Sequence, residues 1–209
     1  MKGLIYSIVF YVLGVLTLSF GVTMLILSDL GIGAWDALFY ALYELIGFTV
    51  GTWIFIVGIL LIILNKFLLQ SRFDYSAILT IFLIGVFIDF WLLVVFEGVI
   101  ITDMAARVGL LGLGVIGMGT GIGMYLQLNF ARNPIDNLMM AVHYRTGLSM
   151  AVSKSGLEFV VLVIAFVLGG PIGIGTIIVA FGIGPIVQFT FNKIAKFKSM
   201  LTGEIHTES

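Results

Sequence analysis

Residues 31–47 read GIGAWDALFYALYELIG and residues 131–147 read ARNPIDNLMMAVHYRTG, which places Asp36 and Asp136 one hundred positions apart. The same offset gives nine identities between residues 13 and 47, the others being Leu13, Gly14, Val15, Gly21, Met24, Leu38, Ala41 and Gly47. We interpret the chain as two repeats, 1–97 and 108–192, followed by a tail, 193–209. Internal repeats in a membrane protein are typical of transporters.

The amino-acid composition is that of an integral membrane protein. Hydrophobic residues make up 61% of the chain and charged residues 10%, with a mean hydropathy of +1.22. Six apolar stretches approach the ~20 residues that cross the hydrocarbon core, namely 3–27, 51–69, 75–96, 108–128, 152–168 and 172–192. The sequence therefore predicts one all-α integral membrane domain, residues 1–209, with six transmembrane helices.

Several classes of protein are disfavoured by what the sequence contains. The first stretch is much longer than the ~7–15 apolar residues of a signal peptide, so we expect it to remain as a membrane anchor. Cysteine is absent and the net charge is -1, which indicate neither a disulfide framework nor a nucleic-acid partner. The only histidines are His143 and His206. We expect no enzyme activity, no catalytic residue, no metal site and no cofactor.

The basic residues predict the topology, provided that the segments 34–46 and 134–146 do not cross the membrane. Nine of the ten then lie on the side of the N-terminus: Lys2, Lys66, Arg72, Arg132, Arg145, Lys154, Lys193, Lys196 and Lys198. Arg107 alone lies on the other side. The positive-inside rule therefore predicts a multi-pass protein with cytoplasmic N- and C-termini. Three spans per repeat make the second repeat enter the membrane from the opposite side, so the repeats are expected to be inverted.

The two intermediate segments have the signals of short helices. Gly47 and Gly147 suit the ends, while Asn133 suits an N-cap before Pro134 at the first helical position. About twelve residues rise only ~18 Å, less than the bilayer core. Each helix is therefore expected either to re-enter the membrane after the first span of its repeat or to lie flat at the interface.

The re-entrant alternative predicts a binding site. If both helix N-termini point to the midplane, their dipoles favour an anionic or strongly polar solute, and Gly31 and Gly33 let it approach the backbone. Asp36 and Asp136 then flank the cavity, beside Asn133 and the polar stripe that includes Tyr40. In the interfacial alternative each Asp only starts an amphipathic helix.

Polar residues inside the spans extend this prediction. Asp89 lies in the third span, and with a one-residue deletion its mate in the second repeat is Gln188. Glu158 follows Lys154 by one helical turn. Because an unpaired charge costs ~2.5–3.5 kcal/mol in a span, we expect Asp89 and Gln188 to share a polar cavity with Glu158 nearby. The alternatives are a structural hydrogen bond for Asp89 and an ion pair with Lys154 for Glu158.

Glycine is frequent in the span 108–128. Gly117 with Gly121, and Gly119 with Gly123, form small-x-x-x-small faces that let helix backbones approach closely. We expect this span to pack against the first one, where Gly14 and Gly21 are the repeat mates of Gly114 and Gly121.

Four motifs resemble the YitT/YczE/YyaS family of bacterial integral membrane proteins: Gly31–Leu38 with its WDAL, Pro134–Leu138, GGPIGIGTI at 169–177 and GIGP at 182–185. The resemblance covers nearly the whole chain. It implies a multi-pass protein of the bacterial inner membrane, often described as transporter-like. Many family members have Gly-Pro-x-Asp in the second motif, where this chain has Asn133.

Together these features predict a permease or transporter that moves a small polar or anionic solute by alternating access. The alternatives are a non-transporting membrane scaffold or regulatory protein and, after these, a channel. The predicted partners are the lipid bilayer and an unknown small solute, with no nucleic acid and with homo-oligomerisation left open. The candidate solute-binding residues are Gly31, Gly33, Asp36, Tyr40, Asp89, Asn133, Asp136, Glu158 and Gln188.

Overall fold

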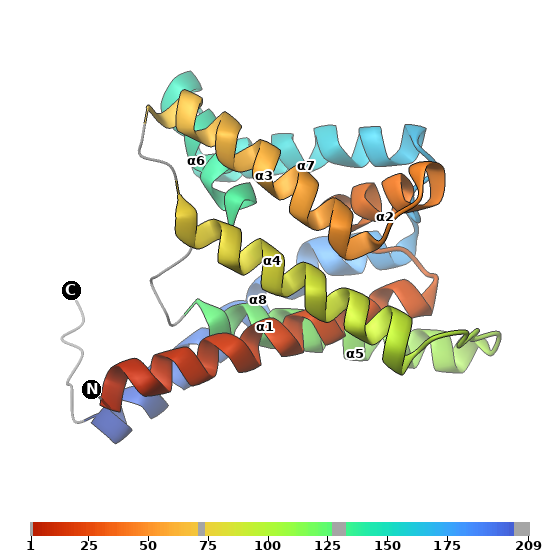
Figure 1. The fold of residues 1–209 in the computed structure, drawn as a ribbon, viewed down its shortest axis with the longest axis horizontal. Coiled ribbons are helices and arrows are strands. Elements are labelled where there is room, and N and C mark those ends of the chain that lie inside the picture. Colours follow the sequence, from red (N-terminus) through yellow and green to blue (C-terminus); the bar gives the residue numbers. More distant parts are fainter. Residues whose placement is uncertain (1, 71–73, 127–132, 203–209) are drawn as a thin grey trace.

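The computed structural model describes residues 2–70, 74–126 and 133–202. All regular structure in these residues is helical (Figure 1). Six helices are long and apolar enough to cross a membrane: α1 (Lys2–Ser28), α3 (Val50–Leu69), α4 (Tyr75–Phe90) with the π-helix η1 (Trp91–Val95), α5 (Met104–Tyr125), α7 (Met150–Val167) and α8 (Ile174–Thr202). The prediction of six long apolar helices that could span a membrane is confirmed. The last helix continues beyond its predicted end, into the tail.

Two short helices complete the described fold, and their bounds agree with the sequence prediction. These are α2 (Ala34–Ile46) and α6 (Pro134–Thr146), of 13 residues each. Asn133 caps α6, because its side-chain oxygen accepts a hydrogen bond of 3.1 Å from the backbone N–H of Ile135. The helices end at Gly47 and Gly147, whose φ angles are 92° and 73°. A residue with a side chain would be strained at these angles, whereas glycine is not. At about 20 Å long, neither helix spans the bilayer core.

Helices α1 and α5 cross in backbone contact through glycine, as the sequence predicted. A Cβ atom on Gly14 would lie 2.8 Å from the carbonyl oxygen of Gly121, and a Cβ atom on Gly21 would lie 2.8 Å from that of Gly114. The hundred-residue offset relates Gly14 to Gly114 and Gly21 to Gly121. The second contact therefore repeats the first with the two helices exchanged.

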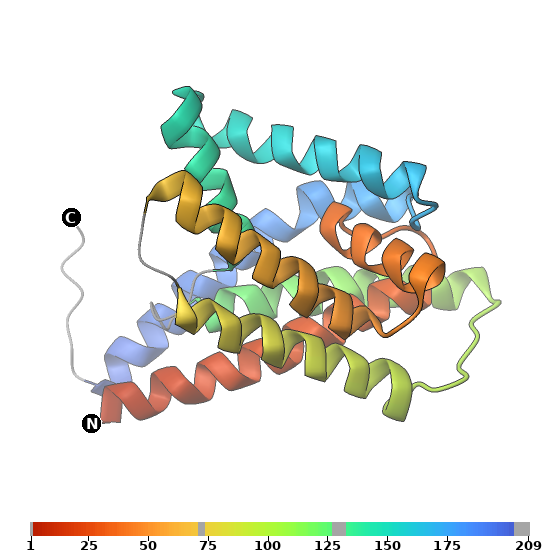
Figure 2. The same ribbon diagram turned by 45° about the horizontal axis from the view of Figure 1, so that its top comes forward.

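The short helices pack against the opposite halves of the chain. Helix α2 packs on α7 and α6 packs on α3, while each also contacts the helix that follows it. Figure 2 shows α6 near the end of the molecule where α1 begins, and α2 toward the opposite end. Buried Ala37, Phe39 and Ala41 fix α2 inside the bundle, and buried Leu138 and Ala141 fix α6.

Helices α3 and α4 are held together at one end. A Cβ atom on Gly51 would lie 2.2 Å from the carbonyl oxygen of Gly85, so the backbones touch. The Asp89 carboxylate accepts hydrogen bonds from the Thr49 hydroxyl at 2.6 Å and from the backbone N–H of Gly51 at 2.8 Å. We call Thr49, Gly51, Gly85 and Asp89 the α3–α4 clasp.

The equivalent helices of the second half, α7 and α8, do not pack along their length. They meet at the turn that joins them and diverge toward the end where α1 begins (Figures 1 and 2). The positions equivalent to the clasp are Ser149, Ala151, Gly184 and Gln188. A Cβ atom on Gly184 would have nothing within 4 Å. The two halves therefore differ at this pair of helices.

The α1–α5 contact makes a prediction about stability. In Gly121→Ala the new methyl group would lie 2.3 Å from the backbone nitrogen of Leu18, so the helices must separate. We expect a loss of about 1–3 kcal/mol, the usual cost of overpacking, measured as a lower melting temperature in detergent. The matched control is Gly112→Ala in the same helix, where a Cβ atom meets nothing within 4 Å. Equal melting temperatures for the two variants would contradict the role of the contact.

Candidate functional site

A cavity of about 950 Å³ lies at the centre of the helix bundle. Each of the eight α-helices contributes to its lining, as does Asn133 before α6. The walls are mainly aliphatic and aromatic, with Leu18, Ile54, Met118 and Ile183 among the side chains. A cavity of this volume, with apolar walls and a few polar groups, is typical of a small-molecule site.

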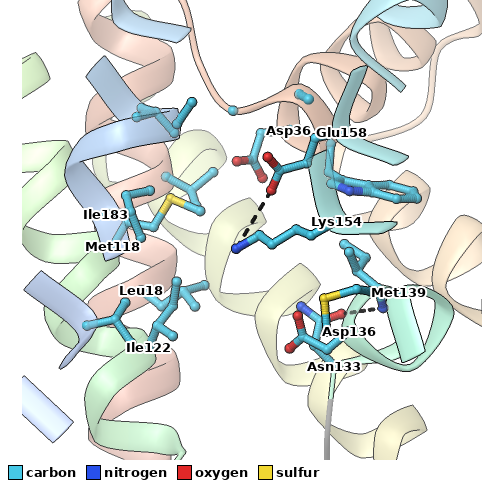
Figure 3. Close-up of a pocket in the computed structure, with 18 of the residues that line it drawn as sticks. Leu18, Asp36, Met118, Ile122, Asn133, Asp136, Met139, Lys154, Glu158 and Ile183 are labelled. Atoms are coloured by element: carbon cyan, nitrogen blue, oxygen red, sulfur yellow. Dashed lines mark hydrogen bonds and ion pairs between the residues drawn. The ribbon is translucent and has the colours of Figure 1, made fainter. Parts of the chain in front are cut away.

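The polar groups come from the two short helices and from α7. Asp36 lies in the first turn of α2, and Asn133 and Asp136 lie at the start of α6. Figure 3 shows Asp36 on one side of the cavity, Asn133 and Asp136 on another, and Lys154 and Glu158 between them. The sequence separations are large, so the packing of α2, α6 and α7 brings these groups together.

Asp36 is the least satisfied of these polar groups. Its side chain is half-buried, and no described residue gives its carboxylate a hydrogen bond or an ion pair. Burial disfavours the charged form and raises the pKa of Asp36 to about 7 from its ordinary value of 3.8. Near neutral pH both the neutral and the charged form of this carboxyl group are therefore populated.

Lys154 and Glu158 form a weak ion pair within α7. The ammonium nitrogen lies 3.9 Å from the carboxylate oxygen, and the two side chains are 61% and 41% exposed. Such a pair contributes only about 0.2–0.5 kcal/mol on an exposed helix. Both side chains line the cavity, so either one is available to a solute at little cost.

The charged side chains of the cavity lining bear on the prediction of a polar or anionic solute. The described lining carries three carboxyl groups, on Asp36, Asp136 and Glu158, and one ammonium group, on Lys154. This balance opposes the entry of an anion.

Six of the nine candidate residues line the cavity: Gly33, Asp36, Asn133, Asp136, Glu158 and Gln188. They come from segments 33–36, 133–136 and two long helices, and the fold brings them together. The prediction that Asp89 shares this cavity with Gln188 is wrong. Asp89 is in the α3–α4 clasp, where two hydrogen bonds occupy its carboxylate.

Gly31 and Tyr40 are also not among the described residues that line the cavity. Gly31 has a φ angle of 105°, and a Cβ atom there would lie 2.5 Å from the backbone nitrogen of Gly173. The absence of a side chain at Gly31 therefore allows the 171–175 turn to pack against its backbone, and no solute is needed to explain this glycine. Tyr40 stacks edge-on against Tyr43, with ring centroids 5.5 Å apart.

Lys154 and Trp35 are among the lining residues that the sequence interpretation of the site did not include. Lys154 was considered only as a partner that neutralises Glu158, although its place one turn from that residue puts it on the same helix face. Trp35 was not among the expected binding residues. Its indole nitrogen is buried and has no hydrogen-bond partner among the described residues. Its position beside Asp36 in the chain was the available signal.

The pKa of Asp36 makes a prediction about pH. The folded value of about 7 lies above the ordinary 3.8, so the stabilisation from protonation is fully present below about pH 4 and is lost as the pH rises to about 7. The melting temperature in detergent should therefore fall over this range more steeply in the parent than in Asp36→Asn. Exposed Glu97 lies outside the cavity, and Glu97→Gln should keep the parental slope. The same slope in all three proteins would show that Asp36 titrates normally.

The chain was compared with protein families and with other proteins. Residues 5–192 match the model of a family of unknown function, DUF6198. The uncharacterized membrane protein YczE of Bacillus subtilis is 35% identical over 87% of this chain and 83% of its own length. The uncharacterized protein YyaS of the same organism is 34% identical over 81% and 84%. An uncharacterized protein of Haemophilus influenzae is 30% identical over 91% of this chain and 84% of its own length.

No solved structure matches the chain at a significant level. The chain is therefore a multi-pass membrane protein that belongs to the YczE/YyaS family.

Proposed function

We propose that this protein is a transporter of the bacterial inner membrane that moves a small polar solute by alternating access. In this proposal the two halves of the chain are inverted repeats, and the central cavity opens to one side of the membrane at a time. The protein carries out no chemical reaction, so the cavity side chains bind the solute and need no cofactor.

Repeated contacts support the inverted repeats. Gly14 meets Gly121 as Gly21 meets Gly114, and α2 packs on α7 as α6 packs on α3. A two-fold axis in the membrane plane would generate both pairs of contacts. Inverted repeats of this kind are common among secondary transporters, where the solute site lies at their interface.

We further propose that α2 and α6 re-enter the membrane from opposite sides. The first turn of each helix lines the cavity, and each helix packs between long helices. Non-helical backbone within the membrane is tolerated where protein surrounds it or where it lines a cavity. The turn before α2 meets this condition, because the Ile32 N–H donates to the Pro171 carbonyl at 3.2 Å.

The difference between α3–α4 and α7–α8 is the observation that carries the proposal. The α3–α4 clasp closes the bundle at one end, whereas α7 and α8 diverge at the other end. A scaffold built from two repeats has no need of this difference. In a transporter, closing one pair of helices while the other is open exposes the cavity to one side only.

Further contacts seal the closed end. The Gly175 N–H donates to the Leu30 carbonyl at 2.7 Å, and Arg107 donates to the backbone carbonyls of Ser28 and Asp29 at 2.8 Å each. Arg107 also pairs with the Asp29 carboxylate. These bonds tie the end of α1 to the starts of α5 and α8. If the basic residues place the termini in the cytoplasm, the seal is extracytoplasmic and the cavity opens inward.

The correspondence between the two repeats predicts which residues would form a clasp in the other state, in which the cavity opens to the other side of the membrane. In that state Ser149, Ala151 and Gln188 would take the roles that Thr49, Gly51 and Asp89 have in the α3–α4 clasp. The Gln188 side-chain oxygen would accept hydrogen bonds from the Ser149 hydroxyl and the Ala151 N–H. Helices α7 and α8 would then close the cytoplasmic end.

The topology can be tested directly, because the chain contains no cysteine. In Thr49→Cys and Ser149→Cys, the single thiols should react from opposite sides of the membrane with a membrane-impermeant maleimide. Thr49→Cys should label in intact cells, and Ser149→Cys only after the membrane is opened. Labelling of both variants from one side would rule out inverted repeats.

Alternating access can be tested by disulfide trapping. In Ser149→Cys/Gln188→Cys, oxidation in membranes should join α7 to α8 although these helices are apart in the structure. The control is Thr49→Cys/Asp89→Cys, at positions whose side chains already touch. Cross-linking should be detectable by mass spectrometry of the peptides that contain the two cysteines. If only the control pair cross-links, α7 and α8 do not close and the scaffold alternative is favoured.

A further inference from the structure

We propose that the solute is an amphiphilic organic monocation, whose charged group binds at Asp36 and whose apolar body lies against the aliphatic and aromatic wall of the cavity. The inference rests on the proposed function for the transport step. Binding itself requires only the cavity and its side chains.

The charges on the cavity lining favour a cation. Lys154 and Glu158 carry opposite charges 3.9 Å apart, so together they add no net charge to the lining. Asp36 and Asp136 are two further acidic groups of the lining, and the two helix N-termini beside them supply about half a positive charge each. That partial charge is spread over the backbone of the first turns. An anion would approach both carboxylates, whereas a cation would meet the Asp36 carboxylate, which has no partner among the described residues.

The walls favour a solute with a large apolar part. Aromatic lining residues come from four helices: Trp35, Phe39, Tyr125, Phe159, Phe181 and Phe191. Trp35 directly precedes Asp36, and its ring lies 6.4 Å from that of Phe39. Aromatic faces beside a carboxylate bind organic cations through cation–π attraction. Because an organic cation is weakly hydrated, it loses little hydration free energy when it enters such a site. A small inorganic cation would leave most of the apolar wall without contacts.

The cavity also reaches the outer surface of the bundle. Phe159 on α7 and Phe181 on α8 both line it, yet they are 66% and 79% exposed. These side chains stand at the two helices that diverge, so the cavity continues between them to the surface that faces lipid in a membrane. An amphiphile dissolved in the bilayer can enter by this route with its apolar part always in contact with apolar groups.

Cation binding at Asp36 is coupled to its proton. Burial raises the pKa of Asp36 to about 7, and a bound cation favours the charged form, so binding near this pH releases a proton. The other titratable groups on the cavity lining are Asp136, Tyr125, Lys154 and Glu158. Of these, only Lys154 carries a positive charge, and Glu158 is its nearest partner. The structure therefore assigns the exchange of a proton for the cation to Asp36.

The test uses two probes of the same shape and opposite charge, tetraphenylphosphonium and tetraphenylborate. Equilibrium dialysis against the purified protein in detergent measures the binding of each probe. We expect tetraphenylphosphonium to bind at least about tenfold more tightly than tetraphenylborate. Its binding should be tighter at about pH 8 than at about pH 6, on either side of the pKa of about 7. It should also release protons into a weakly buffered solution at about pH 7.

The variant Asp36→Asn separates the site from general hydrophobic uptake. It keeps the size of the side chain, and its fold is checked by gel filtration and melting temperature. We expect it to lose at least about tenfold in tetraphenylphosphonium affinity together with the proton release. Glu97→Gln should behave as the parent. Tighter binding of tetraphenylborate, or parental affinity and proton release in Asp36→Asn, would overturn the proposal.

The cation proposal and the transport proposal fail in different experiments. If tetraphenylphosphonium binds and depends on Asp36 but Ser149→Cys/Gln188→Cys never cross-links, the cation site stands and alternating access is wrong. If the cross-link forms and tetraphenylphosphonium does not bind, the transporter stands and the assignment of an organic cation is wrong.

Discussion

The contact between α1 and α5 is the constraint on which the rest of the fold depends. Gly14, Gly21, Gly114 and Gly121 bring two backbones together where any side chain would hold them apart. In a bilayer no hydrophobic effect drives helices together, so close van der Waals contact has to supply the association. Because the two helices cross so closely, the other elements must be arranged around them. The cavity then forms between the halves, where the short helices begin.

The position of the short helices follows from their length and their ends. A helix of 13 residues cannot cross the membrane, and its first backbone N–H groups need partners or water. Turning these ends into a central cavity meets that need, and it also sets a carboxyl group in the first turn of each helix. The long helices supply the apolar wall around them. Polar groups are therefore few, and each one affects what the cavity can bind.

Much of the fold was predictable because membrane spans and helix ends depend on local sequence. Gly47, Asn133, Pro134 and Gly147 gave the limits of α2 and α6, and the repeated glycines gave the central contact. The expected binding residues were less reliable. Asp89 and Gln188 occupy matching positions, yet one is in a clasp and the other lines the cavity. A sequence with two equivalent halves does not show whether α3 and α4 or α7 and α8 are packed together. The packing of either pair belongs to a particular conformation of the protein.

The partners of Asp89 and Gln188 decide how the two proposed conformations are populated. A charged acceptor forms hydrogen bonds worth about 1.5–3 kcal/mol, whereas a neutral amide forms bonds worth about 0.5–1.5 kcal/mol. Ala151 also stands where the first half has Gly51, so a methyl group hinders the approach of α7 to α8. In the proposed transporter, these differences between the two halves favour one conformation at rest. An empty protein would spend most of its time in the form described here, and a solute would have to supply the free energy that shifts the population to the other.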